Sequence, residues 1–125
     1  MRQNAELNGL TGRVEFVCAN AFDILKKYDS EKRRFDVIVL DPPSFTRNRA
    51  SVPDALRGYK EIHLRALKLL KTGGTLATFC CSHHVDTTTF QDVILSAAYD
   101  TRHVLRRVAT YAQSPDHPVL SLIHI

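Results

Sequence analysis

Apolar residues follow two patterns along the chain, and each pattern predicts one kind of element. Residues 37–40 form an uninterrupted aliphatic run, which is typical of a strand buried on both faces of a parallel sheet. Residues 14–18 alternate between apolar and polar side chains, as in a shorter strand. The strands predicted in this way are 14–18, 37–40, 74–79 and 104–111.

Helical spacing of apolar residues separates these strands, and capping residues mark the helix ends. The predicted helices are 1–10, closed by Asn8-Gly9; 21–28; 53–72, closed by Gly73-Gly74; and one that begins near Asp86. The last helix carries an apolar stripe that predicts core packing rather than cofactor binding. Its members are Phe90, Val93, Ile94, Ala97 and Ala98. The alternation of strands and helices indicates an α/β fold with a doubly wound parallel sheet.

Composition indicates one small domain of a cytoplasmic protein. The chain has 125 residues, and no segment approaches the roughly 18 apolar residues of a membrane span. Its first residues do not form a signal peptide. Three cysteines suit a reducing compartment and give no disulfide framework, and Cys18, within a predicted strand, is expected to fill the core.

The net charge of +4 comes with basic residues in clusters. Such clusters are typical of a surface that contacts a phosphate backbone, but a solvated surface explains each of them as well. They are Lys26-Lys27, Lys32-Arg33-Arg34, Arg47 with Arg49, and Arg102 with Arg106-Arg107.

Candidate chemistry lies where two predicted strands end. Asp41-Pro42-Pro43 follows the strand 37–40, and Cys80-Cys81-Ser82 follows the strand 74–79. Ligand crevices of open α/β sheets lie at the carboxyl ends of the strands, so the acid and the thiols are expected to face one crevice. Asp-Pro-Pro by itself is also a common way to end a strand. His83-His84 beside the cysteines lacks the spacing of a tetrahedral metal site, and no metal is expected.

Four motifs occur in an order that resembles a known family. They are Asp41-Pro42-Pro43-Ser44-Phe45, Arg57-Gly58-Tyr59-Lys60, Thr78-Phe79-Cys80-Cys81-Ser82 and Asp116-His117-Pro118. The set is similar to that of S-adenosylmethionine-dependent methyltransferases related to the bacterial large-subunit rRNA cytosine-C5 methyltransferase. The resemblance covers nearly the whole chain and implies ribosomal RNA as the partner; it leaves the oligomeric state open.

The resemblance also implies how much of a Rossmann-like class I methyltransferase fold the chain contains. With the strand order 3-2-1-4-5-7-6, the chain retains strands 3 to 6 and lacks the first two strands and the last. The glycine-rich cofactor turn would then precede residue 1. Only strands 4 and 5 would remain neighbours, so we expect poor folding of the isolated chain. Residues 1–119 are expected to be a partial catalytic domain, and 120–125 a non-native tail or, alternatively, a terminal strand.

Catalytic roles follow from the same resemblance. Cys81, favoured over Cys80, matches the nucleophile whose thiolate adds to cytosine C6, and a nearby helix N-terminus would favour the thiolate. Asp41 would hydrogen-bond the N3 or amino edge of the cytosine. Ser44 stands where two-cysteine enzymes have their second thiol, so the base that removes the C5 proton is unassigned.

Binding roles are implied for two further sets of residues. The cofactor set is Asn20, Ala21, Phe22, Asp41 and Pro42, in which the Asn20 carbonyl would accept from the adenine amino group unless Asn20 simply caps a helix. The substrate set is Pro43, Ser44, Arg57, Tyr59 and Lys60, although Tyr59 also fits the apolar stripe of its helix.

Two other functions stay open at this point. A methyltransferase acting on a purine nitrogen of RNA or DNA would use the aspartate and prolines without a thiol. A basic nucleic-acid-binding module without catalysis would use only the charge clusters.

Overall fold

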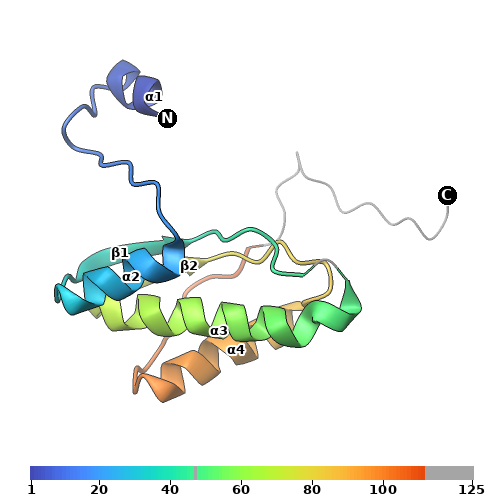
Figure 1. Ribbon diagram of the computed structural model, residues 1–125. Coiled ribbons are helices and arrows are strands. Elements are labelled where there is room, and N and C mark those ends of the chain that lie inside the picture. The colour runs from blue at the N-terminus through green and yellow to red at the C-terminus, as the bar shows by residue number, and fades with distance from the viewer. Residues whose placement is uncertain (47, 112–125) are drawn as a thin grey trace, which may run out of the picture.

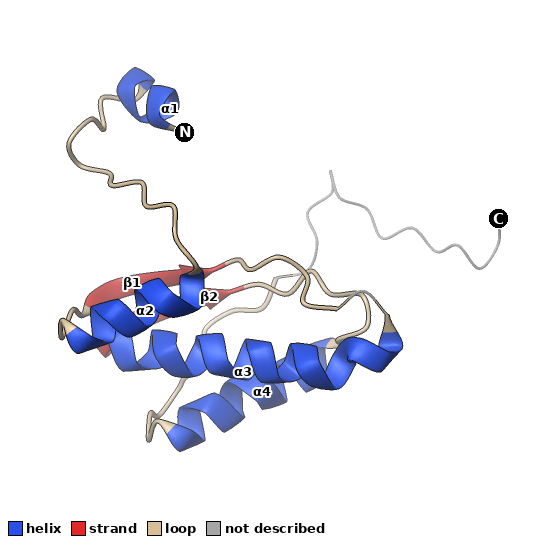
Figure 2. Ribbon diagram, in the orientation of Figure 1, coloured by secondary structure: helices blue, strands red, loops and turns tan. Residues whose placement is uncertain are grey.

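Two parallel strands joined by a long helix form the centre of the structure, a computed structural model that describes residues 1–46 and 48–111 (Figure 1). The strands pair directly, with Val37 opposite Thr75 and Leu40 opposite Thr78. In chain order the elements are α1 (Arg2–Leu7), α2 (Ala21–Ser30), β1 (Phe35–Leu40), the 3-10 turn η1 (Arg49–Ser51), α3 (Val52–Leu69), β2 (Leu70–Thr78) and α4 (Thr87–Asp100). Figure 2 shows α2 and α3 beside this pair of strands and α4 next to α3.

The helices begin where the capping residues predict. The Asn20 side chain accepts from the backbone of Phe22 and Asp23 at the start of α2, and Asp86 accepts from Thr89 at the start of α4. A proline lies in the first turn of α3, where its missing N–H has no intrahelical partner to lose. The Asn20 and Asp86 side chains accept from backbone N–H groups that have no partner within the helix, and they thereby fix where α2 and α4 begin.

The predicted end of the long helix is wrong by a few residues. α3 ends at Leu69, and the chain enters β2 at once, so Gly73 and Gly74 lie inside β2 rather than at the helix end. Gly73 has φ +79°, and a Cβ on Gly74 would lie 2.9 Å from the Asp36 carbonyl oxygen. The two glycines are therefore needed where β2 bends against β1, which matches the register irregularity between Phe35 and Val37.

α3 provides the core. Leu40, Ile62 and Ala66 are buried together, with Phe22, Leu25, Ile38 and Leu76 packed against them. Leu67, Ala97 and Ala98 form a second buried cluster between α3 and α4. The stripe predicted for α4 is buried at its two alanines and half-buried at its larger members. One face of the sheet is thus covered by α2 and α3, and α4 packs on α3.

The opposite face of the sheet is bare in the described residues. Val37 is 60% exposed and Val39 is 61% exposed, so the prediction that this run is buried on both faces is wrong here. The physical reason is that α2 and α3 both pack on the side of Ile38 and Leu40. The α/β class is confirmed, and the described sheet is covered on one face only.

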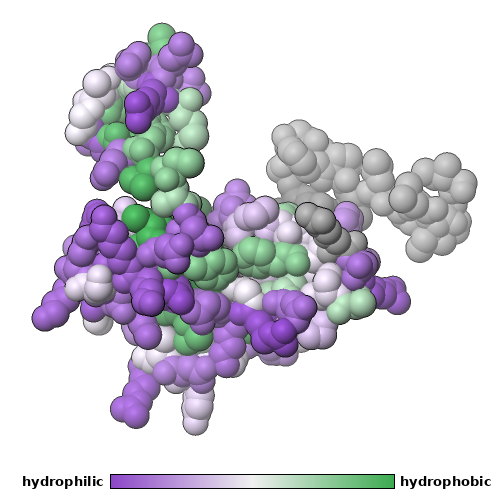
Figure 3. Space-filling view, viewed as in Figure 1, coloured by the Kyte–Doolittle hydropathy of each residue, from purple (hydrophilic) through white to green (hydrophobic). Residues whose placement is uncertain are grey.

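The two outer predicted strands do not form. Residues 14–18 and 104–111 join no ladder, Val104 is fully exposed, and Cys18 is exposed rather than in the core. A strand needs a partner for its backbone groups, and neither segment has one here. Of the four predicted strands, those at 37–40 and 74–79 pair with each other in the described residues, as expected. Figure 1 shows α1 and the following segment projecting from the rest, and Figure 3 shows apolar surface on this projection.

Several expectations fall outside the described residues. They concern Arg47, the Asp116-His117-Pro118 motif, the boundary at residue 119 and the tail 120–125.

Candidate active site

The segments that follow β1 and β2 lie against each other, as their sequences predict. We call residues 41–46 the acid loop and residues 79–86 the thiol loop. The Phe79 amide donates to the Leu40 carbonyl at 2.9 Å, which continues the pairing just past β2. The Cys81 thiol then donates to the Pro42 carbonyl at 3.7 Å. Asp41 and Cys81 are both exposed, so a thiol and a carboxylate flank one accessible edge of the sheet.

The two adjacent cysteines have different surroundings. Cys81 is exposed and contacts the acid loop through Pro42. Cys80 is half-buried and is a hydrogen-bond neighbour of the Tyr59 hydroxyl. Of the two thiols, Cys81 is therefore the more accessible.

Three hydroxyl groups join the two loops to α3. The Ser82 hydroxyl lies 3.0 Å from that of Ser44 in the acid loop and 2.8 Å from that of Tyr59 in α3. Ser82 is only 5% exposed, and Tyr59 has no exposed surface. Burial, followed by hydrogen bonding to Cys80, raises the pKa of Tyr59 to about 12. Tyr59 therefore packs, as its place in the apolar stripe predicts, and offers no surface to a substrate.

A row of aromatic rings links the acid loop to three helices. The ring centroids of Phe22 and Phe45 are 6.3 Å apart, those of Phe45 and Tyr59 are 4.7 Å apart, and those of Tyr59 and Phe90 are 5.4 Å apart. These separations are typical of favourable aromatic pairs. The row connects α2, the acid loop, α3 and α4.

His63 connects α3 to the end of β2. It is fully buried, with Nδ1 2.6 Å from the Tyr59 carbonyl oxygen and Nε2 2.8 Å from the Thr78 hydroxyl. Since a carbonyl only accepts, Nδ1 carries the proton of the neutral ring and Nε2 accepts from Thr78. Desolvation by burial lowers the pKa of His63, which favours this neutral form. The contact supports the last residue of β2, just before the thiol loop.

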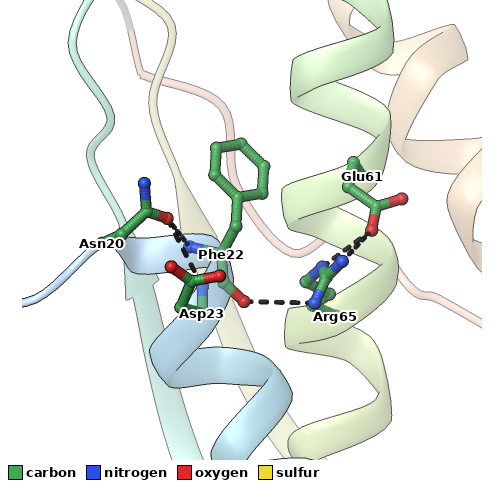
Figure 4. Close-up of polar contacts among 5 residues, drawn as sticks. All are labelled: Asn20, Phe22, Asp23, Glu61 and Arg65. Atoms are coloured by element: carbon green, nitrogen blue, oxygen red, sulfur yellow. Dashed lines mark hydrogen bonds and ion pairs between the residues drawn. The ribbon is translucent and has the colours of Figure 1, made fainter.

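The predicted adenine-contacting segment lies at the start of α2, as Figure 4 shows. The Asn20 side-chain oxygen Oδ1 accepts from the Phe22 amide at 2.9 Å and from the Asp23 amide at 3.4 Å. The capping interpretation of Asn20 is thus confirmed. Arg65 of α3 donates to the Phe22 carbonyl at 3.1 Å and to a Glu61 carboxylate oxygen at 2.7 Å. Arg65 therefore ties the first turn of α2 to α3.

The basic members of the predicted substrate set both have acidic partners. Arg57 pairs with Asp54 one turn earlier in α3, and both side chains are exposed. Lys60 pairs with Asp100 at 2.7 Å. In the described residues, no hydrogen bond or ion pair joins either residue to the acid or thiol loop. Pro43 and Ser44, in contrast, are exposed within the acid loop itself.

The basic clusters at 26–27 and 32–34 lie toward the other end of the sheet. β1 begins directly after the second cluster, whereas the acid loop follows the end of that strand. Arg33 lies 4.1 Å from the centre of the Tyr28 ring, and Arg34 pairs with Asp29 at 3.7 Å. For these two clusters the structure favours a solvated, partly ion-paired surface over an extension of the site.

The N-terminus of α4, which was expected to favour the Cys81 thiolate, is already capped by the carboxylate of Asp86. Asp86, at the end of the thiol loop, accepts from the Thr89 backbone at 2.7 Å, and hydrogen bonds from Thr89 lower the pKa of Asp86. The carboxylate of Asp86 thus occupies the positive end of α4.

Some features that would suggest other functions are not found in residues 1–46 and 48–111. No helix there is long and apolar enough to cross a membrane. Nor does any group of three or more His, Cys, Asp or Glu side chains there assemble as metal ligands. A groove of about 320 Å³ between α2 and α3 is lined by residues such as Leu25, Glu61 and Arg65, and none of the predicted site residues lines it.

The residues that sequence reasoning missed are His63, Arg65 and Ser82. Ser82 stood in a quoted motif without a role, and His63 lies one turn from Tyr59. Glu61 and Arg65 have the i, i+4 spacing of a helical ion pair, which is a readable signal. The partners of His63, Arg65 and Ser82 lie in β2, α2 and the acid loop, which are distant in sequence, so these contacts could not be predicted from the sequence.

Known proteins resemble the chain over nearly all its length. No family model matches it. The ribosomal RNA large subunit methyltransferase I of Klebsiella pneumoniae strain 342 is 44% identical over 121 residues, which are 96% of this chain and 30% of that protein. Proteins of the same name from Erwinia tasmaniensis and Yersinia pestis are 40% and 38% identical over 96% of this chain and 31% of their own length. The resemblance to large-subunit rRNA methyltransferases is confirmed, and the chain spans about 30% of the relatives' length.

Proposed function

We propose that the protein containing this chain is an S-adenosylmethionine-dependent methyltransferase that acts on cytosine C5 of large-subunit rRNA. The names of its relatives support rRNA methylation. The observation that carries the cytosine C5 assignment is the contact of the exposed Cys81 thiol with Pro42, directly after Asp41. A purine nitrogen methyltransferase needs the acid and the prolines but has no use for a thiol there.

The chemistry needs a nucleophile because C5 of cytosine is unreactive. The Cys81 thiolate adds to C6, forming an S–C6 bond and moving an electron pair to C5. Asp41 hydrogen-bonds the N3 or amino edge and stabilises the ring during this attack. When bound, S-adenosylmethionine would supply an electrophilic methyl group, which C5 would take up as the methyl–sulfur bond breaks and S-adenosylhomocysteine leaves. A base then removes the C5 proton, and breakage of the S–C6 bond restores the thiolate.

Ser44 is not the base in this scheme. Its hydroxyl donates to the Thr46 carbonyl at 2.9 Å and also lies next to Ser82. A neutral alcohol is too weak a base to take a proton from carbon at neutral pH, and the Ser44 oxygen already accepts from the Thr46 amide at 3.4 Å. Ser44 therefore stands at the position of the second thiol of two-cysteine enzymes but cannot take over its chemical role.

The cofactor would be held by Asn20, Ala21, Phe22, Asp41 and Pro42. The Phe22 and Phe45 rings bring the start of α2 next to the acid loop, so the two parts of this set are neighbours. The Asn20 carbonyl already accepts two backbone bonds, whereas its amide nitrogen points away from the helix (Figure 4). We therefore replace the expected carbonyl contact by an amide N–H donated to a ring nitrogen of adenine.

The RNA would meet Pro43 and Ser44 first, since both are exposed in the acid loop beside Cys81. Arg57 and Lys60 would contribute phosphate contacts only by leaving their acidic partners. Tyr59 takes no part in this binding because it has no exposed surface.

A covalent trap tests the proposal. The full-length protein is incubated with S-adenosylmethionine and rRNA containing 5-fluorocytidine, in which fluorine cannot leave as a proton. We expect a stable protein–RNA adduct that is lost in Cys81→Ser and retained in the matched variant Cys80→Ser. Methylation of ordinary rRNA without any adduct would favour a purine nitrogen instead. Salt-dependent RNA binding without methylation would favour the non-catalytic module.

A further inference from the structure

Ser82 is the junction between the acid loop, the thiol loop and α3. It follows Cys81 directly, and its hydroxyl contacts both Ser44 and Tyr59. The last backbone bond between the strand ends is that of Phe79 with Leu40, and the acid and thiol loops continue beyond it. In the described residues, the contacts that then join the two loops are those of Ser82 with Ser44 and Cys81 with Pro42.

The directions of the hydrogen bonds that link Tyr59, Ser82, Ser44 and Thr46 can be assigned. Ser44 donates its only hydroxyl proton to the Thr46 carbonyl, because a carbonyl cannot donate. Ser82 must therefore donate to Ser44, and Tyr59 must donate to Ser82. The result is a one-way chain from Tyr59 through Ser82 and Ser44 to Thr46, and the Cys80 thiol is a further neighbour of the Tyr59 hydroxyl.

The chain starts from a rigid donor. The Tyr59 ring is fully buried and lies between Phe45 and Phe90, at centroid distances of 4.7 and 5.4 Å. Burial raises the pKa of Tyr59 to about 12, so the hydroxyl keeps its proton at neutral pH. Thr46, at the other end of the chain, is also buried, at 8% exposure. Cooperative networks of this kind fix the position of their members.

We propose that Ser82 and Tyr59 are positioning residues for the reaction, because their hydroxyl groups hold Cys81 at a fixed distance from the acid loop. This inference rests on the proposed function, in which Cys81 attacks a cytosine that Asp41 holds. A nucleophile and a base-binding group on two separate loops must be registered to within about 1 Å, and a misplacement of that size costs on the order of 100-fold in rate. Neither residue touches the substrate.

The test uses Tyr59→Phe in the full-length protein, because this change removes only the hydroxyl. We expect kcat for rRNA methylation and the rate of 5-fluorocytidine adduct formation to fall together by about 10- to 100-fold, with KM for S-adenosylmethionine unchanged. Ser82→Ala is expected to cause a similar loss, and the double variant little more, since the two hydroxyls act as one unit. Tyr99→Phe is the matched control, because Tyr99 is 85% exposed and its hydroxyl lies outside the cluster.

Each outcome separates the inference from the proposed function. If the wild type forms the adduct and Tyr59→Phe keeps the wild-type kcat, the positioning role is overturned. A Tyr59→Phe variant that loses thermal stability but not kcat would overturn it as well. Should Tyr59→Phe fail to fold, Ser82→Ala decides the question by the same two rates. A wild type that methylates rRNA without an adduct would overturn the thiol chemistry itself.

Discussion

Replacement of His63 by phenylalanine should loosen the end of β2 and change how its stability depends on pH. His63 donates to the Tyr59 carbonyl and accepts from the Thr78 hydroxyl, and it has no exposed surface. Phenylalanine keeps an aromatic ring next to Phe90, whose centroid lies 5.6 Å from that of His63. The variant therefore removes the two nitrogens and little of the packing.

The expected cost follows from the hydrogen bonds that are lost. Each bond contributes about 0.5–1.5 kcal/mol, and a buried hydroxyl without an acceptor costs about 1–3 kcal/mol. Thr78 is half-buried, so its hydroxyl can reach water in part. We expect the free energy of opening of α3 and β2 to fall by about 2–4 kcal/mol. The control His84→Phe, at an exposed position, should change it by less than about 0.5 kcal/mol.

The pH dependence gives the sharper result. Burial lowers the pKa of His63 from its ordinary value of 6.5, so the unfolded chain takes up this proton at a higher pH than the folded chain. The stability that depends on neutral His63 is therefore fully present above pH 6.5 and is lost as the pH falls below it. One proton accounts for at most about 1.4 kcal/mol per pH unit.

Amide hydrogen exchange in the full-length protein measures this stability locally. The difference in opening free energy between wild type and His63→Phe should be constant above about pH 6.5 and shrink below it. Other titrating groups are common to both proteins and cancel in the difference. A difference that stays constant down to about pH 5 would show that His63 titrates alike in both states, and would refute the buried neutral ring.

Three further predictions concern the fold and the site. Gly74→Ala should destabilise the strand pair by about 1–3 kcal/mol, measured by hydrogen exchange, because the new Cβ would lie 2.9 Å from two backbone carbonyl oxygens. The control Gly58→Ala should be tolerated, because its Cβ would lie 3.4 Å from the Phe45 side chain. Leu67→Ala should cost about 2–5 kcal/mol and release α4, whereas Leu95→Ala, at a position 59% exposed, should cost less than about 1 kcal/mol; equal losses would exclude Leu67 as an anchor. Absorbance titration should show one tyrosine that ionises at about pH 12, and this ionisation step should be absent in Tyr59→Phe. The neutral form of Tyr59 contributes stability that is fully present below pH 10 and is lost as the pH rises toward 12.

Local signals in the sequence predicted the elements that local physics decides. The caps Asn20 and Asp86 and the apolar spacing of α3 predicted the helices, because capping and one-sided burial act within a few residues. The acid and thiol loops were predicted as neighbours because parallel strands end at one edge of a sheet.

Features that depend on distant partners could not be predicted. Ser44 and Ser82 are 38 residues apart, and nothing in either motif shows that their hydroxyls meet. The exposure of Val37 and Val39 depends on which segments cover the second face, and apolar character alone does not reveal that. For the same reason, residues 14–18 have the alternation of a strand but no partner to pair with.

α3 is the common support of the three segments that make up the candidate site. Tyr59 supports the two loops, His63 supports the end of β2, and Arg65 supports the start of α2. Tyr59 and His63 are one turn apart on the same face of the helix, and Arg65 lies two residues further on, toward α2. None of these contacts involves the exposed side chains of Val37 or Val39 on the bare face. Under the proposed positioning role, α3 and the hydroxyl chain set the separation of Asp41 and Cys81, which should therefore not depend on what covers the second face of the sheet.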